Sequence, residues 1–400
     1  MSIRRMWWFA TAVSVGGGAT LGAPLPIHGT SVRPASAALA DTFPRFDRVM
    51  LLETTSETSA NVSLGDLNGD GKLDVVLAKG RHWPLVDRVM LGDGSGNFGA
   101  AYDLGTASDR SYSGRLADVD RDGDLDVVIS NDAPDAKLIY LNDGKGKFSV
   151  GSSYGRPDWP TRNATVADVD GDSYPDIVAA NRGDSASANY ICFNKRGRFD
   201  ADCVAFSREP ATTIAAADFN GDGAVDLAVP HRDGGQSRVY LAGPRGRFSP
   251  SRVVAFGPPN AGIRMSEAAD MNGDGVLDLV TIDERTGTAV YFGQRAGGFS
   301  SGVIVSDGKP TPYALAVADV NGDGKPDVIV GNVEAQPVVH FNDGSGRTFH
   351  SVAFGDAKGV VYGFAIADVN RDGLADIAMA RSDAPNVLYF ASRNGETRPK

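Results

Sequence analysis

The chain has 400 residues, and 39 lysines and arginines against 50 aspartates and glutamates give it a formal net charge of −11 at pH 7. No strongly basic stripe stands out, which argues against nucleic acid as a partner. The length alone would predict two or three domains, but a repeat that runs through the chain overrides this expectation.

The first 40 residues have the features of an export signal. Arg4-Arg5 precede an apolar run from Met6 to Val15, and three glycines then interrupt it. This run is too short for a comfortable membrane span, and Ala38-Leu39-Ala40 resembles a cleavage site. We therefore predict a signal peptide at residues 1–40 and a secreted, periplasmic or cell-surface protein without a stable membrane span. An uncleaved anchor is the alternative.

A nine-residue acidic motif recurs along the rest of the chain. Its first copy is Asp-Leu-Asn-Gly-Asp-Gly-Lys-Leu-Asp at residues 66–74, and successive copies begin 49 to 52 residues apart. The seven copies begin at Asp66, Asp118, Asp168, Asp218, Asp270, Asp319 and Asp368. A fixed period of this size is typical of repeat architectures, so residues 41–400 are predicted to form one domain.

Each repeat contains four apolar runs that are short enough to be β-strands. In the second repeat these are Arg115–Ala117, Asp126–Ser130, Lys137–Leu141 and Phe148–Ser152. Several runs are apolar at consecutive positions, as in Val127-Val128-Ile129, which indicates strands that are covered on both faces. Four-stranded sheets arranged about an axis meet this requirement. We therefore predict an all-β fold, a seven-bladed β-propeller.

A phenylalanine after a glycine-rich turn marks the last strand of the repeats. The series is Phe98, Phe148, Phe199, Phe248, Phe299 and Phe349, which is one short of seven. Phe46 supplies the seventh member, because it precedes Asp66 by the same 20 residues that separate Phe98 from Asp118. The last repeat ends near Phe390 without an outer strand. We therefore predict that the N-terminal strand around Phe46–Leu52 completes the seventh blade and closes the ring.

The acidic motif has the spacing of a calcium-binding loop. With Asp66 as position 1, side chains at positions 1, 3 and 5 point into a tight turn, and Asp74 completes the set at position 9. The carbonyl of Lys72 adds an oxygen at position 7, and Gly71 at position 6 permits the sharp reversal. Oxygen ligands without Cys or His favour calcium over zinc or copper. The alternative is that Asp, Asn and Gly simply make hairpin turns.

Seven sets of calcium ligands are predicted from positions 1, 3, 5 and 9. They are Asp66, Asn68, Asp70 and Asp74; Asp118, Asp120, Asp122 and Asp126; Asp168, Asp170, Asp172 and Asp176; Asp218, Asn220, Asp222 and Asp226; Asp270, Asn272, Asp274 and Asp278; Asp319, Asn321, Asp323 and Asp327; and Asp368, Asn370, Asp372 and Asp376. The third loop is the weakest, because Ser173 replaces the glycine at position 6.

The chain has two cysteines, Cys192 and Cys203, which flank a predicted turn. Export makes a disulfide between them plausible, but two buried free thiols are an equal alternative, because geometry decides the matter.

One further register points to a ligand site. The residue six positions before each leading aspartate is Ala60, Tyr112, Arg162, Thr212, Arg264, Tyr313 or Tyr362, and a propeller would place these residues around its axial mouth. Tyrosine and arginine suit sugars or anionic groups. The candidate ligand-binding residues are therefore Tyr112, Arg162, Arg264, Tyr313 and Tyr362. Tyrosine and arginine also line polar funnels without binding anything.

The acidic loops resemble those of the FG-GAP/VCBS repeat family, which includes the propeller of integrin α subunits and many secreted bacterial proteins. The resemblance covers the chain from about Phe46 to Phe390 and implies a seven-bladed β-propeller with calcium in the loop between the first two strands of each blade. It does not settle an activity, because fold is not function.

Three functions remain open from the sequence. We expect a monomeric binding or adhesion module whose partner is a glycan or an extracellular protein. The second possibility is a polysaccharide lyase that draws its base and its cationic groups from residues such as His82, His231, Tyr112 and Arg162. No local motif assigns these catalytic roles. The third is a structural part of an extracellular assembly.

Overall fold

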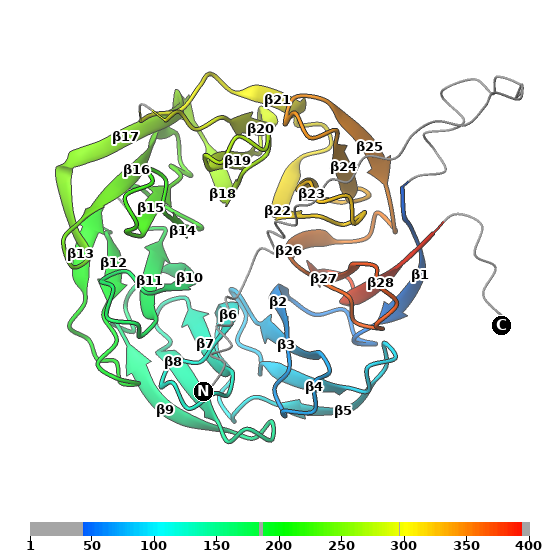
Figure 1. The fold of residues 1–400 in the computed structure, drawn as a ribbon. Helices are drawn as coiled ribbons and strands as arrows, with labels where there is room; N and C mark the ends of the chain where they lie inside the picture. The colour runs from blue at the N-terminus through cyan, green and yellow to red at the C-terminus, as the bar shows by residue number, and fades with distance from the viewer. Residues whose placement is uncertain (1–42, 184–186, 296, 394–400) are drawn as a thin grey trace, which may run out of the picture.

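The computed structural model describes residues 43–183, 187–295 and 297–393, so the predicted signal peptide lies outside the described residues. The described residues form seven four-stranded antiparallel sheets around a central axis and contain no helix (Figure 1). The prediction of an all-β, seven-bladed propeller is therefore confirmed.

Each blade is a meander of four strands, with the first strand nearest the axis and the fourth at the rim. Blade 1 contains β2 (Ser59–Gly65), β3 (Asp74–Lys79), β4 (Arg88–Gly92) and β5 (Phe98–Asp103); blade 2 contains β6 (Ser111–Ala117), β7 (Asp126–Asn131), β8 (Lys137–Asn142) and β9 (Phe148–Tyr154); blade 3 contains β10 (Thr161–Ala167), β11 (Asp176–Asn181), β12 (Asn189–Cys192) and β13 (Val204–Ser207); blade 4 contains β14 (Ala215–Ala217), β15 (Asp226–Val229), β16 (Gly235–Gly243) and β17 (Arg247–Ala261). Blade 5 contains β18 (Ile263–Ala269), β19 (Asp278–Asp283), β20 (Gly287–Tyr291) and β21 (Val303–Ser306); blade 6 contains β22 (Pro312–Ala318), β23 (Asp327–Asn332), β24 (Val338–Asn342) and β25 (Phe349–Ala353); blade 7 contains β26 (Val360–Ala367), β27 (Asp376–Ser382) and β28 (Val387–Ser392) together with β1 (Arg45–Leu51).

The seventh blade joins the two ends of the described chain. β1 pairs antiparallel with β28, so that Val49 lies opposite Tyr389 and Leu51 lies opposite Val387. The guanidinium of Arg48 also lies 4.0 Å from the centre of the Phe390 ring. This pairing gives β1 and β28 to each other as neighbours, and the sheet therefore has fewer unpaired strand edges.

The hydrophobic core is divided into seven layers, each between two adjacent blades. In the layer between blades 2 and 3, Val128 and Ile139 of one blade pack with Ile177 and Ala179 of the next. The second strand of each blade lies between two such layers and is buried along its length. The blades are therefore covered on both faces, as their continuous apolar runs require.

Small residues precede the leading aspartates because the inner strands are crowded. A Cβ atom on Gly65 would lie 2.7 Å from Cδ1 of Leu116 in the next blade. The inner strands also begin earlier than their apolar runs: β6 begins at Ser111 rather than at Arg115. Polar residues at the start of an inner strand still pair with the second strand, as Ser111 pairs with Asn131.

A buried ion pair lies where the first and seventh blades meet. Lys79 at the end of β3 and Glu53 after β1 are both less than 10% exposed, and their charged groups are in contact. Nδ2 of Asn386 donates a hydrogen bond of 2.6 Å to the second oxygen of Glu53. Glu57, which is more exposed, also lies 2.5 Å from the Lys79 amine. These contacts tie the N-terminal segment to blades 1 and 7.

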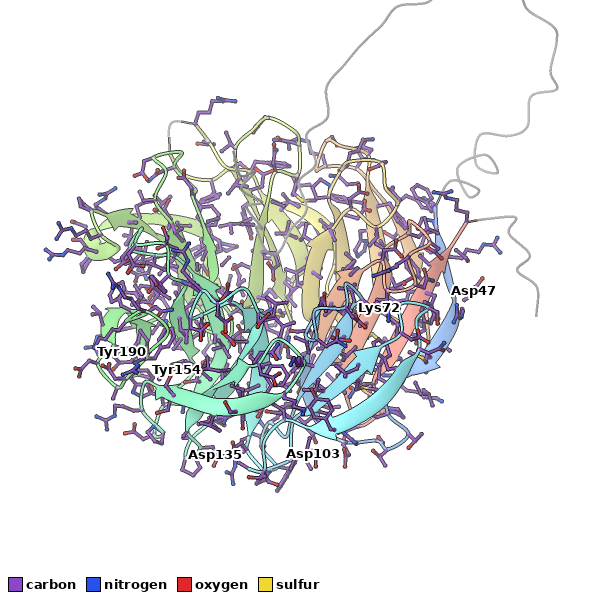
Figure 2. All side chains as sticks on the ribbon, turned by 60° about the horizontal axis from the view of Figure 1, so that its bottom comes forward. Asp47, Lys72, Asp103, Asp135, Tyr154 and Tyr190 are labelled. Atoms are coloured by element: carbon purple, nitrogen blue, oxygen red, sulfur yellow. A yellow bond between two sulfur atoms is a disulfide. The ribbon has the colours of Figure 1, made fainter. Side chains whose placement is uncertain are left out.

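The loops divide between two faces of the ring. The loops between first and second strands share one face with the hairpins between third and fourth strands, because the strands of each blade alternate in direction. The remaining connections lie on the opposite face. In Figure 2, Lys72 lies at one edge of the blades and Asp103 and Asp135 lie at the other. We call these the acidic-loop face and the axial-mouth face.

Candidate functional site

The seven acidic loops are shaped by hydrogen bonds from their own backbone. In the first loop, Oδ1 of Asp66 accepts from the N–H of Gly69 at 2.9 Å, and Oδ2 accepts from Gly71 at 2.7 Å. Oδ1 of Asn68 accepts from the N–H of Asp70 at 3.0 Å. Gly71 has a φ of 78°, and Ser173 adopts 76° at the same position of the third loop. The third loop therefore keeps the turn, although a side chain at positive φ strains the backbone.

The aspartate at position 9 has a structural role that its sequence position did not reveal. In each loop it is at most 1% exposed, and both of its oxygens accept hydrogen bonds from backbone N–H groups. In blade 2, Oδ2 of Asp126 accepts from Val119 at 2.9 Å and Oδ1 accepts from Asn142 at 2.9 Å. The equivalent bonds recur in the other six blades at 2.7–3.1 Å.

Burial raises the pKa of these position-9 carboxyls above the value of a free aspartate. The pKa reaches about 7 in Asp126, Asp176 and Asp327 and about 6 in Asp226, Asp278 and Asp376, although the hydrogen bonds from backbone N–H groups oppose the shift. A nearby cation would favour the ionised form of such a group.

The second and third loops bring three carboxylates together. Asp118, Asp120 and Asp126 offer oxygens that lie within 4.8 Å of one another, and Asp168, Asp170 and Asp176 do the same. Calcium binds oxygen at 2.3–2.6 Å, so one ion could bridge oxygens at this separation. The donor set therefore fits a hard divalent cation. The other five loops have asparagine at position 3 and so carry one carboxylate fewer.

Several acidic loops also pack against the next blade, a contact that the sequence analysis missed. Gly197 in the hairpin of blade 3 faces Asp120 so closely that a Cβ atom would lie 2.5 Å from the Cβ of Asp120. Gly246 in the next hairpin faces Asp170 in the same way. The side-chain amide of Asn194 donates a bond of 2.8 Å to the carbonyl of Val119. The glycines that recur in these hairpins were the sequence signal from which this contact could have been predicted.

On the opposite face, the five predicted ligand-binding residues lie around the axis, and each sits at a β-bulge. The pairing of each inner strand with the second strand shifts at this position, as between Ser111 and Ser113 and between Thr161 and Asn163. A bulge inserts one unpaired residue and re-aims its side chain. The bulged residue lies six positions before the first aspartate of the acidic motif, and the bulge explains why its side chain faces the axis.

The first group of axial residues comes from blades 1 to 3. The guanidinium of Arg162 lies 4.4 Å from the centre of the Tyr112 ring and forms an ion pair of 2.5 Å with Asp132. The hydroxyl of Tyr112 lies 3.0 Å from Nε2 of His82. Burial lowers the pKa of His82, and the charge of Arg81 adds to this effect.

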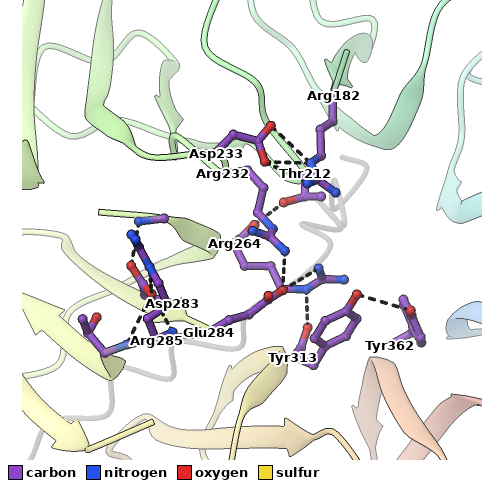
Figure 3. Close-up of polar contacts among 12 residues, drawn as sticks. Arg182, Thr212, Arg232, Asp233, Arg264, Asp283, Glu284, Arg285, Tyr313 and Tyr362 are labelled. Atoms are coloured by element: carbon purple, nitrogen blue, oxygen red, sulfur yellow. Dashed lines mark hydrogen bonds and ion pairs between the residues drawn. The ribbon is translucent and has the colours of Figure 1, made fainter. Parts of the chain in front are cut away.

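The second group comes from blades 4 to 7 (Figure 3). Arg264 is buried, with its guanidinium 3.3 Å from the centre of the Tyr313 ring, and it pairs with Glu284 at 3.1 Å. Arg232 contacts the same glutamate. The Tyr362 hydroxyl lies 3.4 Å from that of Tyr313. Burial raises the pKa of Tyr313, but the guanidinium of Arg264, the hydrogen bond to Tyr362 and the charge of Arg81 together lower it overall.

Arg81 and Asp132 belong to the axial cluster but were not predicted. The guanidinium of Arg81 lies 3.8 Å from the centre of the Tyr362 ring, and it donates a bond of 3.1 Å to the hydroxyl of Ser382. One recurring sequence position could have revealed Asp132 and several other residues that surround the five predicted ones. The residues six after each position-9 aspartate are Gly80, Asp132, Arg182, Arg232, Glu284, Val333 and Ser382. His231, named for the lyase alternative, packs instead against Gly235 of its own blade.

Cys192 and Cys203 form a disulfide, with the two Cα atoms 4.3 Å apart. It joins the end of β12 to the residue before β13 and so settles the alternative of two free thiols.

The comparison with known families rests on the repeated segments. Six overlapping segments match the FG-GAP-like repeat family, at residues 66–129, 118–179, 168–229, 218–281, 270–330 and 319–379. The chain belongs to this family. Together the matches span residues 66–379, so the resemblance drawn from the acidic loops is confirmed. No curated protein matches the sequence significantly.

Solved propellers share the fold at low sequence identity. The BP39L lectin from Burkholderia pseudomallei is 15% identical with a TM-score of 0.64, and the match covers 83% of this chain and 95% of the lectin. BBS1N, solved in complex with ARL6DN, is 12% identical with a TM-score of 0.59 over 89% of this chain and 99% of BBS1N. The Dos1 propeller is 9% identical with a TM-score of 0.55 over 87% and 95%. In the described part of the chain, no helix is long and apolar enough to cross a membrane.

Proposed function

We propose that the protein is an exported, calcium-binding β-propeller that acts as a binding or adhesion module for a glycan or a protein ligand. The predicted signal peptide would direct it to a compartment where calcium is abundant. Propellers of this fold include a lectin and a domain solved with a protein partner, which supports a binding role.

The acidic loops are the proposed calcium sites, through the residues at positions 1, 3, 5 and 9. Bound calcium would supply positive charge that offsets the crowded carboxylates. The loop hydrogen bonds hold the position-1 and position-3 oxygens in place before any ion binds. We further propose that the pairing of β1 with β28 holds the ring closed in solution, as a clasp between the two chain ends.

The ligand site is proposed at the axial mouth, and the stacked arginines and tyrosines are the observation that carries it. Five arginines lie there, at 81, 162, 182, 232 and 264, against three carboxylates at 132, 233 and 284. Two positive charges are therefore left over, on a chain whose net charge is negative. Trp83, which is 71% exposed, lies beside His82 on the same face. Exposed aromatic rings and free cationic charge suit acidic sugars or anionic protein segments.

A glycan array, run with calcium and again with a chelator, tests this proposal. We expect saturable binding that Arg162→Ala weakens at least about tenfold, because the change removes the cation that covers Tyr112. The matched control is Arg110→Ala, since Arg110 pairs with Asp135 at 2.9 Å on the same face but outside the axial cluster. Equal affinity in the wild type and Arg162→Ala would remove the axial mouth as the site.

A second function, polysaccharide lyase, is favoured by one contact. Tyr112 and His82 come from different blades, yet the Tyr112 hydroxyl lies 3.0 Å from a ring nitrogen of His82, with Arg162 beside them. A tyrosine–histidine pair can move a proton, and an arginine can offset a uronate carboxylate. Incubation with uronate polysaccharides would then produce unsaturated products that absorb ultraviolet light. If no absorbance develops in the wild type, lyase activity on these polysaccharides is excluded.

A further inference from the structure

A cavity of about 510 Å³ lies between blades 2 and 3, beside the second acidic loop and away from the axial mouth. Blade 2 contributes Asp120, Leu141 on β8 and Ser152 on β9 to its walls. Blade 3 contributes Arg196, Arg198 and Phe199 from the hairpin between β12 and β13. The hairpin is fixed in place, because Gly197 packs directly against Asp120.

The polar groups of this cavity have unused binding capacity. Arg196 and Arg198 are exposed, and among the described residues neither forms an ion pair. Oγ of Ser152 is buried and has no hydrogen-bond partner there. A buried hydroxyl without a partner is rare in folded proteins and calls for an explanation, such as a bound group. Arginine guanidiniums and hydroxyl groups are donors that bind the oxygens of a carboxylate or a sulfate.

The remaining walls suit the carbon skeleton of a sugar. Leu141 is partly buried and Phe199 is 7% exposed, so an apolar surface lies beside the cationic groups. Ligand sites commonly combine such surfaces with a few polar groups that fix orientation. An acidic sugar could place its ring on this surface and its anionic group toward the arginines.

Asp120 opposes an anionic ligand unless its charge is offset. Its carboxylate lies with those of Asp118 and Asp126 in the loop whose donor set fits a divalent cation. A cation held there would turn this wall from repulsive to attractive. Binding at the cavity should therefore depend on calcium.

We propose that this cavity is a second ligand site, which binds an acidic saccharide. Arg196 and Arg198 hold its carboxylate or sulfate, the Ser152 hydroxyl donates a hydrogen bond to it, and occupation of the second acidic loop by calcium raises the affinity. This inference rests on the proposed calcium occupation of the second acidic loop but not on the axial mouth, so a failure of the axial mouth as a ligand site would leave it intact.

Calorimetric titration with three disaccharides tests the proposal: one with a uronate, one with a sulfate and one neutral. With calcium present, we expect saturable binding of at least one acidic disaccharide and at least about tenfold weaker binding of the neutral one. Which acidic disaccharide binds identifies the anionic group. Chelation should weaken the interaction severalfold. Failure of both acidic sugars to bind would overturn the proposal.

Variants separate this site from general charge attraction. Arg196→Ala with Arg198→Ala should weaken binding at least about tenfold. The control is Arg245→Ala with Arg247→Ala, which removes the same charge from the exposed hairpin that packs on the third acidic loop, and it should change binding less than about twofold. Equal losses in both double variants would overturn the site.

Ser152→Ala distinguishes a ligand contact from a structural role. The hydroxyl makes no hydrogen bond in the described structure, so its removal should not lower the melting temperature, while affinity should fall severalfold. Unchanged affinity would show that the hydroxyl takes no part in binding and would contradict the proposal. Arg110→Ala, at a residue outside both proposed sites, should leave this affinity unaltered.

Discussion

The two faces of the propeller are stabilised by different kinds of contact. On the acidic-loop face, seven copies of one motif form the same bonds, between a position-9 carboxylate and N–H groups 7 and 15–18 residues away. On the axial-mouth face, most contacts occur only once. Asn386 and Glu53, which are 333 residues apart, form one of them.

This difference shows what a sequence repeat can encode. A contact that recurs within every repeat leaves a recurring residue pattern, and that pattern can be read in advance. A contact that occurs once leaves no such pattern. The axial-mouth face therefore differs from blade to blade, and this is where we place the ligand of the proposed function.

The largest effect is expected where a single buried pair supports the axial-mouth face. Lys79→Met would leave the Glu53 carboxylate buried without its cation, and should lower the free energy of unfolding by about 3–5 kcal/mol. Denaturant unfolding measures this change. The double variant with Glu53→Gln should recover most of the loss. Glu57→Gln, at a side chain that is 38% exposed, should cost less than about 1 kcal/mol. Equal losses in Lys79→Met and Glu57→Gln would refute the special role of the buried pair.

A smaller effect is expected from one copy of the repeated contact. Asp126→Ala would leave the buried N–H groups of Val119 and Asn142 without an acceptor, and should cost about 2–4 kcal/mol even when a chelator is present. Asp120→Ala, at the more exposed position 3, should cost less than about 1 kcal/mol under the same conditions. If the two variants were equally stable in chelator, position 9 would be only a metal ligand.

Calcium should stabilise the acidic-loop face through each filled loop. A site at 100 times its dissociation constant contributes about 2.7 kcal/mol, so chelation should lower the melting temperature clearly. Asp120→Asn gives the second loop the asparagine that five other loops have at position 3, and it should reduce the calcium-dependent part of the stability by about 1 kcal/mol. Asn272→Asp in the fifth loop should act in the opposite direction. A melting temperature that changes with neither calcium nor chelator would contradict the assignment of the acidic loops as calcium sites.

The smallest change in stability is expected at the axial mouth itself. Tyr112→Phe removes the contact with His82 but keeps the ring that Arg162 covers, so the cost should stay below about 1 kcal/mol. Ligand binding, or lyase activity if present, should fall far more than stability does. A large drop in melting temperature with intact binding would mean that Tyr112 supports the fold rather than the ligand.

Several features followed from the sequence because they recur. The motif period predicted seven blades, and the spacing within the motif placed the turns that begin at Asp66 and its six counterparts. The register six residues before each motif selected Tyr112, Arg162, Arg264, Tyr313 and Tyr362, which all lie around the axis. In each case, residues at the same position of successive repeats occupy equivalent places in successive blades.

Other features were decided only when the chain folded. The bulges that turn the axial side chains inward, the pairing of Arg162 with Asp132 and the burial of Lys79 against Glu53 depend on distant segments meeting. The disulfide between Cys192 and Cys203 depends on the distance between the two residues in the folded chain, which the sequence does not give. The physical reason is that interactions repeated in every blade produce a periodic residue pattern in the sequence. A single contact between remote segments produces no such pattern and forms only in the folded structure.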